Sequence, residues 1–270
     1  DYAVVWKPPA AMLQGRTELK GIFNLGAGVD AILQLGDALP AGVPIVRLDD
    51  AGMAVQMAEY VTHAVLRYFR RLDAFDAQAR KGQWGFLKPH EKSAFTVGLL
   101  GLGVLGTRIA AALAHFDFPL RGWSRSMKTV PGMTCHVGEQ GLDAFLRGTR
   151  VLVCVLPLTD DTRGILNRAN LAKLPEGAYV INAARGAHMV EEDLLALVRE
   201  KHIAGATLDV FEQEPLPPAH PFWQEPRITI TPHMAALTLC GESVRQIAAK
   251  MRAMERGEPI AGVVDIMKGY

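Results

Sequence analysis

Short runs of β-branched and other apolar residues alternate along the chain with longer stretches in which apolar positions recur every three or four residues. The first pattern is typical of buried strands and the second of amphipathic helices. The alternation predicts an α/β fold built on parallel sheets. Strands are expected at 2–6, 19–26, 44–48, 95–100, 119–123, 150–156, 178–182, 204–209 and 227–230. Helices are expected at 28–36, 104–115, 139–147, 167–174, 190–200 and 239–256.

The longest helical pattern covers residues 52–80, where apolar positions from Met53 to Phe75 keep the helical spacing. At about 1.5 Å per residue this helix would span about 40 Å, more than one domain face needs. Two interpretations stay open: a core helix with an amphipathic stripe, or a helix that lies between domains and forms a homodimer. A loop is expected at 82–92.

Composition narrows the class of protein. The chain has 270 residues, 49% of them hydrophobic, which is enough for one large or two ordinary globular domains. The formal net charge of +1 gives no reason to expect nucleic acid or an anionic membrane as a partner. The three cysteines lie far apart, so we expect neither a disulfide framework nor a metal site, and a cytoplasmic location.

A glycine-rich loop follows the expected strand at 95–100 and precedes an Ala-rich helix, which is the context of a dinucleotide-binding loop. Gly101 would make the tight turn, Gly103 would admit the pyrophosphate, and Gly106 would let helix and strand pack closely. The free N–H groups at the helix start, from Val104 and Leu105, would bind the phosphates. A methyltransferase that binds S-adenosylmethionine is the main alternative.

The loop after the next strand indicates which dinucleotide is bound. An Asp or Glu about 20 residues after the first glycine binds the ribose hydroxyls of NAD. This chain has no carboxylate there; the candidate residues are Ser124, Arg125, Ser126 and Lys128. Cations and hydroxyl donors suit the dianionic 2′-phosphate of NADP(H). The alternative is a solvated basic loop.

Three candidate catalytic residues, Arg185, Glu214 and His233, each come shortly after an expected strand. Ligands of α/β proteins bind beyond the carboxyl ends of the strands, so we expect the three side chains to gather there. Each residue also has a purely structural interpretation. Arg185 could form an ion pair at a strand end, Glu214 could be a turn residue before proline, and His233 could be a structural histidine whose ring nitrogens are hydrogen-bonded.

Several segments together resemble the D-isomer-specific 2-hydroxyacid dehydrogenases over nearly the whole chain: NLGAGVD, GLGVLG, WSRS, LPLTDDTRGILN, NAARG, LDVFEQEPLP and TPHMAA. The resemblance implies two doubly wound domains. A Rossmann-type cofactor domain (51–236) would be inserted in a flavodoxin-like substrate domain (1–50, with 237–270 returning to it). Because family members carry several tens of further residues before the 2–6 strand, the substrate domain is expected to lack its first strand and helix. Whether such a segment precedes Asp1 stays open.

The resemblance also implies an NADPH-dependent reduction of small 2-oxo acids such as glyoxylate and hydroxypyruvate. His233 would donate a proton to the carbonyl oxygen. Glu214 would hold the imidazole and favour its protonated form. Arg185 would bind the substrate carboxylate and polarise the carbonyl. A sensor of the same fold that binds NADPH without turnover is the alternative function.

Further residues are expected around this centre. The backbone N–H groups of Leu25, Gly26, Ala27 and Gly28 would form a second carboxylate cradle, and Trp6 would either flank the substrate pocket or fill the core. By resemblance, Asp209 and the backbone at Ala183 would lie near the nicotinamide carboxamide. Leu156, Pro157 and Thr162 would pass beside the cofactor. The remaining histidines lack such partners and are expected in surface or packing roles: His63, His90, His115, His136, His188, His202 and His220.

Overall fold

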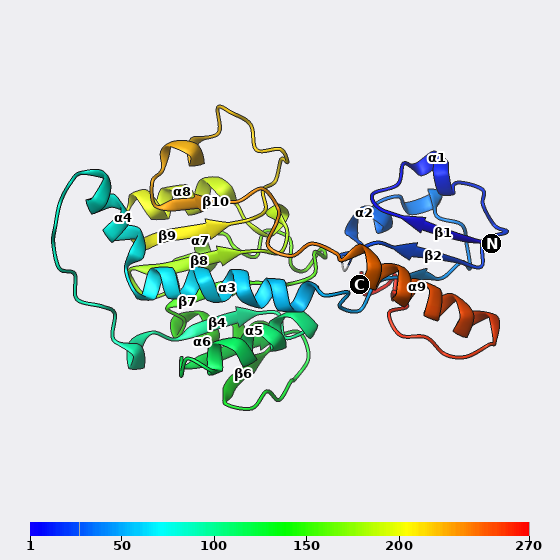
Figure 1. Cartoon of the computed structure of the whole chain (residues 1–270), viewed down its shortest axis with the longest axis horizontal. Helices are drawn as coiled ribbons and strands as arrows, with labels where there is room; N and C mark the ends of the chain where they lie inside the picture. Colours follow the sequence, from blue (N-terminus) through cyan, green and yellow to red (C-terminus); the bar gives the residue numbers. More distant parts are fainter. Residues whose placement is uncertain (27, 270) are drawn as a thin grey trace. The chain divides into compact units, whose positions relative to one another are not determined.

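The computed structural model describes residues 1–26 and 28–269 (Figure 1). The chain divides into two compact units. Unit 1 comprises Asp1–Met53, Pro157–Asp161 and Leu237–Tyr270, and unit 2 comprises Ala54–Leu156 and Thr162–Ala236. Ala27, one member of the expected amide cradle, lies outside the described residues.

Unit 1 is built on a parallel sheet in the order β1-β2-β3. Its strands are β1 (Tyr2–Val5), β2 (Gly21–Asn24) and β3 (Ile45–Val46). Its helices are α1 (Ala10–Leu13), α2 (Asp30–Leu33), the 3₁₀ helix η1 (Gly36–Ala38) and α9 (Cys240–Glu255). The core is a cluster in which Leu13, Ile22 and Ile32 are fully buried.

Polar contacts tie α9 to the segment that follows β3. The buried Lys250 donates from Nζ to the Arg47 carbonyl at 2.9 Å and lies 3.1 Å from the Asp49 carboxylate. The Asp49 N–H donates to the Gln246 side chain at 2.8 Å. A buried ammonium needs such partners, because an unpaired charge is costly away from water. The last long helix is therefore an integral part of unit 1.

Unit 2 contains a sheet of seven parallel strands in the order β10-β9-β8-β7-β4-β5-β6. The strands are β4 (Val97–Leu100), β5 (Leu120–Ser124), β6 (Met133–Val137), β7 (Val151–Cys154), β8 (Ala178–Asn182), β9 (Ile203–Leu208) and β10 (Ile228–Ile230). The predicted α/β fold with parallel sheets is confirmed. The direction of winding reverses between β4 and β7, and such switch points are where α/β sheets form ligand crevices.

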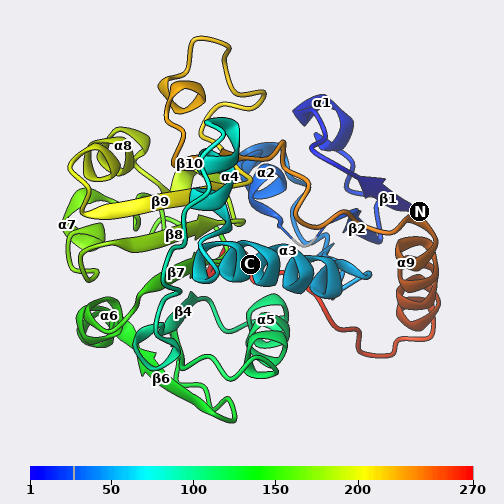
Figure 2. The same cartoon turned by 60° about the vertical axis from the view of Figure 1, so that its left-hand side comes forward.

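Helices cover both faces of this sheet (Figure 2). The helices of unit 2 are α3 (Met53–Phe69), α4 (Leu72–Arg80), α5 (Val104–Ala114), α6 (Gly138–Arg147), α7 (Arg168–Leu171) and α8 (Glu191–Arg199), with the 3₁₀ helices η2 (Lys92–Ala94), η3 (Gly186–His188) and η4 (Pro221–Gln224). Alternate residues of β7 enter different cores: Leu152 joins the cluster beneath α6 and α8, whereas Val153 joins the cluster beneath α3 and α5. Burial on both faces explains why the strand is a continuous apolar run.

The expected continuous helix over 52–80 is wrong. The first helix ends at Phe69, and Arg71 adopts a left-handed backbone with φ of 58° before α4 begins. The rings of Tyr68 and Phe69 both pack on Phe95, which holds the end of α3 against the core. The apolar spacing continues across the break, so periodicity alone conceals it.

Strand β6 was not anticipated. It pairs only with β5 at the edge of the sheet, and its residues are half-buried or exposed, so it lacks a clear apolar pattern. Its pairing also extends β5 by one residue to Ser124, which lies opposite Val137. The expected strand end at Trp123 is therefore one residue short. The short helix α1 was also missed.

Candidate active site

The glycine-rich loop joins β4 to α5 at the switch point of the sheet. Gly101 has φ of 107°, and a Cβ there would lie 2.9 Å from the Val155 carbonyl oxygen, beyond the end of β7. A Cβ on Gly106 would lie 2.0 Å from the Gly101 carbonyl oxygen. These two positions therefore require glycine for the turn and for helix–strand packing. Around Gly103, by contrast, a Cβ would meet no described atom within 4 Å, so space is open beside this residue.

The start of α5 is suited to an anion. Gly103 is the N-cap residue, and the first turn contains no acidic residue. The first N–H groups of a helix lack partners within it and carry the positive end of its dipole. Of the other residues expected beside a cofactor, Leu156 and Thr162 are buried and Pro157 is exposed.

The loop after β5 separates one internal hydroxyl from an exposed basic segment. The Ser124 side chain is buried, and its Oγ donates to the Ser126 carbonyl at 2.7 Å. Arg125, Ser126 and Lys128 are exposed. Ser124 therefore shapes the turn, while its three neighbours present charge and hydroxyl groups outward.

His233 and Glu214 form a pair. Imidazole Nδ1 lies 2.8 Å from Glu214 Oε2, and the other carboxylate oxygen accepts the Phe211 N–H at 3.1 Å. The side chains are 36% and 29% exposed, so the pair is held in place and still open to solvent. Glu214 lies in the loop after β9, and His233 lies in the loop after the neighbouring strand, β10.

Arg185 follows β8, the next strand in the sheet. Its Nη1 donates to the Ala184 carbonyl at 2.7 Å, and its N–H donates to His188 Nδ1 at 3.2 Å. Asn182 supports the same turn by donating to the Arg185 carbonyl at 3.1 Å. A Cβ on Gly186 would lie only 1.9 Å from the Phe211 carbonyl carbon. This close approach presses the Arg185 loop against the loop that carries Glu214.

Asp209 immediately follows β9 and is only 1% exposed. Its carboxylate accepts the backbone N–H groups of Met234 and Ala235 at 2.9 and 2.8 Å, and its carbonyl accepts the His233 N–H at 2.8 Å. Ala183, expected with it near a carboxamide, is also buried. The structure thus gives Asp209 an internal role that the sequence pattern did not indicate.

The expectation that His220 lacks a carboxylate partner is wrong, whereas His188 has the packing role expected of it. His188 is fully buried and accepts the Arg185 N–H. The Nε2 atom of His220 lies 3.1 Å from a carboxylate oxygen of Glu191, whose other oxygen accepts the Glu212 N–H at 3.0 Å. Glu191 therefore braces the loop that carries Glu214. The contact between His220 and Glu191 has no local sequence signal, because the two residues are 29 positions apart and β9 lies between them.

In unit 1, the loop after β2 has its own internal supports. The Asn24 amide donates to the carbonyls of Gly26 and Gly28 at 3.0 and 2.8 Å. A Cβ on Gly26 would lie 2.2 Å from the ring of Trp6, so glycine is required for this packing. Trp6 is 51% exposed, and the alternative of a plain core role is wrong.

One member of the expected amide cradle is already occupied. The Leu25 N–H donates to the Val5 carbonyl at 2.9 Å, continuing the pairing of β2 with β1. The Leu25 amide is therefore not available to bind a substrate carboxylate. The expectation for Gly26 and Gly28 is unaffected by this bond.

Within residues 1–26 and 28–269, no cluster of His, Cys, Asp and Glu side chains could hold a metal ion. No helix over the same residues has the length and apolar character needed to span a membrane. The candidate chemistry therefore rests on the glycine loop, the basic segment and the residues after β8, β9 and β10.

Comparison with known proteins decides the family. The family model described as D-isomer specific 2-hydroxyacid dehydrogenase, NAD binding domain, matches residues 62–235. The chain belongs to the D-isomer specific 2-hydroxyacid dehydrogenase family. The resemblance in the sequence motifs is thereby confirmed.

Curated members of this dehydrogenase family are similar over the whole chain. A protein of Yersinia enterocolitica named glyoxylate/hydroxypyruvate reductase A is 52% identical over 274 residues, covering 100% of this chain and 88% of the relative. A protein of the same name from Serratia proteamaculans is 53% identical with the same coverage.

Solved structures of the family agree. A D-isomer specific 2-hydroxyacid dehydrogenase from Xanthobacter autotrophicus Py2, in complex with NADPH and MES, is 43% identical with a TM-score of 0.95, covering 100% of this chain and 85% of that one. An NADPH-dependent glyoxylate/hydroxypyruvate reductase from Sinorhizobium meliloti, in complex with NADP and sulfate, is 41% identical with a TM-score of 0.93, covering 100% and 86%.

Proposed function

We propose that this chain is an NADPH-dependent reductase of small 2-oxo acids, with glyoxylate and hydroxypyruvate as substrates. The observation that carries the proposal is the His233–Glu214 pair, with 2.8 Å between Nδ1 and Oε2, in loops after neighbouring strands of a dehydrogenase-family sheet. The names of the similar proteins support the same substrates. NADPH, when bound, supplies the hydride.

The cofactor is held by the two loops after β4 and β5. Its pyrophosphate would lie in the open space beside Gly103, next to the first N–H groups of α5, which have no partner within the helix. Arg125 and Lys128, both exposed, take the 2′-phosphate. Ser124 contributes by shaping the turn, since its hydroxyl donates to the Ser126 carbonyl. Asp209 and Ala183 are proposed, with Leu156, Pro157 and Thr162, to line the nicotinamide side.

His233 donates the proton. Its Nδ1–H bonds to Glu214, so Nε2 is the ring nitrogen directed to the substrate carbonyl oxygen. The carboxylate holds the ring in one orientation, as general acid catalysis requires. As charge develops on the carbonyl oxygen, the proton on Nε2 neutralises it.

Arg185 binds the substrate carboxylate and stabilises the developing charge on the neighbouring carbonyl oxygen. A guanidinium offers several donors in a planar fork that matches a carboxylate. The turn from Asn182 to His188 fixes the backbone from which it projects. Within unit 1, the N–H groups at Gly26 and Gly28 and the exposed ring of Trp6 form a second candidate substrate-binding loop.

The proposal is tested with purified protein, NADPH and either glyoxylate or hydroxypyruvate. Pyruvate serves as a third 2-oxo acid for comparison. Steady loss of reduced cofactor that depends on both protein and 2-oxo acid is expected. The same mixture with NADH should react more slowly. Saturable NADPH binding without oxidation for any of these acids would contradict the proposal and favour a sensor.

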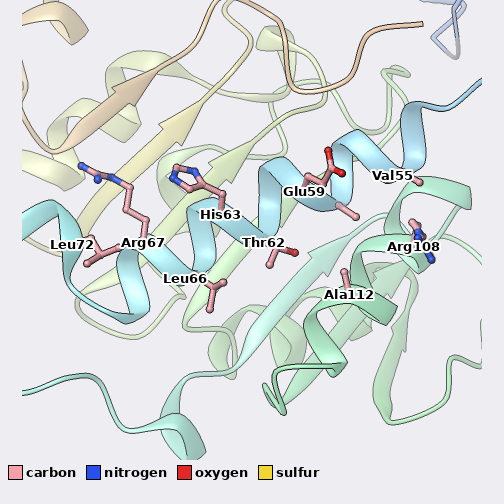
Figure 3. Close-up of a pocket in the computed structure, with 10 residues that line it drawn as sticks. Val55, Glu59, Thr62, His63, Leu66, Arg67, Leu72, Arg108 and Ala112 are labelled. Carbon is pink, nitrogen blue, oxygen red and sulfur yellow. The ribbon is translucent and has the colours of Figure 1, made fainter. Parts of the chain in front are cut away.

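We also propose a homodimer through α3. A groove of about 660 Å³ runs between α3 and α5, with Glu59 on one helix and Arg108 on the other (Figure 3). Its apolar lining includes the exposed Val55 and Leu72. A second copy related by a two-fold axis would bury this lining and could pair Glu59 of each copy with Arg108 of the other.

Val55→Glu should convert such a dimer to a monomer in analytical ultracentrifugation, whereas Val244→Glu, a similarly exposed valine on α9, should not. A monomeric wild type would contradict the dimer.

We also propose a reducing, cytoplasmic location. The free, widely separated cysteines support it.

A further inference from the structure

The buried carboxylate of Asp209 has a third donor besides the two backbone N–H groups. Thr231 Oγ1 donates to Asp209 Oδ1 at 2.6 Å. A carboxylate that is almost completely removed from water needs such donors, because an unsatisfied buried charge is expensive. The described residues include no salt bridge to Asp209, so hydrogen bonds do this work. Thr231 therefore sets which way the carboxylate faces.

Thr231 is in turn held by Tyr60. The Tyr60 hydroxyl lies 2.7 Å from Thr231 Oγ1. Because Thr231 has one hydroxyl proton and gives it to a carboxylate, which only accepts, Tyr60 must be the donor in this contact. Burial raises the pKa of Tyr60 well above its ordinary value, with a smaller contribution from the Asp209 charge, so the phenol keeps its proton. Two hydrogen bonds thus run in one direction from α3 to Asp209: the Tyr60 hydroxyl donates to Thr231, and the Thr231 hydroxyl donates to the carboxylate.

Asp209 holds the segment around His233 in an unusual backbone conformation. His233 has φ of 53°, a left-handed region that non-glycine residues rarely occupy. Such conformations persist when their surroundings over-determine them. Here the backbone carbonyl of Asp209 accepts the His233 N–H, and its carboxylate accepts the N–H groups of the next two residues, Met234 and Ala235. Asp209 therefore fixes the backbone at His233 and immediately after it, and so the point from which the imidazole projects.

We propose that Tyr60 and Thr231 are positioning residues for the acid–base pair. Through Asp209, they fix the left-handed backbone at His233 and hence the distance and angle at which Nδ1 meets Glu214. The inference rests on the proposed function, since it assigns a role relative to proton donation by His233. Neither residue needs to touch substrate for this role.

Substitutions at these two positions test the role. Tyr60→Phe removes one hydroxyl, and Thr231→Val removes the donor to Asp209 without changing side-chain shape. We expect kcat to fall on the order of tenfold for Thr231→Val and several-fold for Tyr60→Phe, with the KM for NADPH within about twofold. Thr231→Ser retains the donor and should restore most of kcat. The double variant should lose little more than Thr231→Val, because both residues act through one chain.

A matched control exists in the same unit. Tyr179 and Thr207 form a second buried tyrosine–threonine hydrogen bond of 2.9 Å, on β8 and β9 and without contact to Asp209 or His233 among the described bonds. Tyr179→Phe therefore removes a similar hydrogen bond and should lower thermal stability as Tyr60→Phe does. It should leave kcat near the wild-type value. A fall in kcat equal to that of Tyr60→Phe would show a general effect of lost stability and overturn the proposal.

A spectroscopic measurement separates this proposal from the function itself. In protein with ¹⁵N-labelled histidine, the imidazole resonances of His233, assigned by their loss in His233→Ala, report the bond from Nδ1 to Glu214. Thr231→Val should shift them, and Tyr179→Phe should not. Unchanged resonances together with unchanged kcat would overturn the positioning role while leaving the reductase intact. Absence of turnover in the wild type with shifted resonances would overturn the reductase but retain the positioning of His233.

Discussion

The loop that carries His233 and the loop from Ser124 to Lys128 both follow strands of one sheet, yet they are held very differently. The His233 loop is fixed by the Asp209 carboxylate, by Thr231 and by the hydrogen bond to Glu214. In the second loop, Ser124 is buried and bonded, while the residues that follow it are exposed. The first loop is held by several hydrogen bonds around His233, whereas the second carries exposed basic side chains after a buried serine.

The difference fits the two tasks that the loops are proposed to perform. Proton transfer needs donor and acceptor within hydrogen-bond reach, so an error of an ångström is costly. Attraction between cations and a phosphate dianion falls slowly with distance, and long side chains can adjust to the ligand. A rigid loop for acid–base chemistry and an adaptable one for charge recognition therefore follow different strands of the same sheet.

The largest effect is expected at the rigid loop. His233→Ala should lower kcat for 2-oxo acid reduction by about 10²-fold or more, because the proton donor is lost. Steady-state kinetics with glyoxylate measures the loss of kcat. The control is His115→Ala, because His115 caps the end of α5, at the opposite end of the strands. A rate near that of the wild type would remove His233 from the mechanism.

A smaller effect, of a different kind, is expected at the exposed loop. Arg125→Asp places a carboxylate where the 2′-phosphate is proposed to bind, and should shift the ratio of kcat/KM for NADPH over NADH by about 10- to 100-fold toward NADH. Arg199→Asp makes the same charge change at the end of α8, near the amino ends of the strands. It should not shift the ratio of kcat/KM for NADPH over NADH. An unchanged ratio for Arg125→Asp would refute the assignment of this loop.

The smallest effect is expected for Ser124→Ala. The hydroxyl already donates to the Ser126 carbonyl, so its removal loosens the turn and takes no donor from the phosphate. The KM for NADPH should rise by only about two- to fivefold, the scale of one neutral hydrogen bond. Titration of NADPH at fixed glyoxylate measures the change. A rise as large as that from Arg125→Asp would mean that Ser124 binds the phosphate directly.

Much of the fold was predictable because its signals are local. The apolar runs at β4, β7 and β8 are buried on both faces, and this burial is written into consecutive residues. The edge strand β6 was missed because its exposed positions leave no such pattern. The break at Arg71 was missed because the helical spacing of apolar residues continues on either side of it.

The sequence by itself determined the parallel α/β fold, the glycine loop at Gly101–Gly106 and the candidate trio after three strands, because periodicity and motif spacing are properties of near neighbours. Only the tertiary structure decided that Tyr60 supports Thr231, 171 residues away, that Glu191 pairs with His220, and that the Leu25 amide is already bonded. These contacts depend on the order of strands in the sheet and on which side chains meet across loops. No local pattern records that order, because hydrogen-bond partners are chosen by distance in space rather than along the chain.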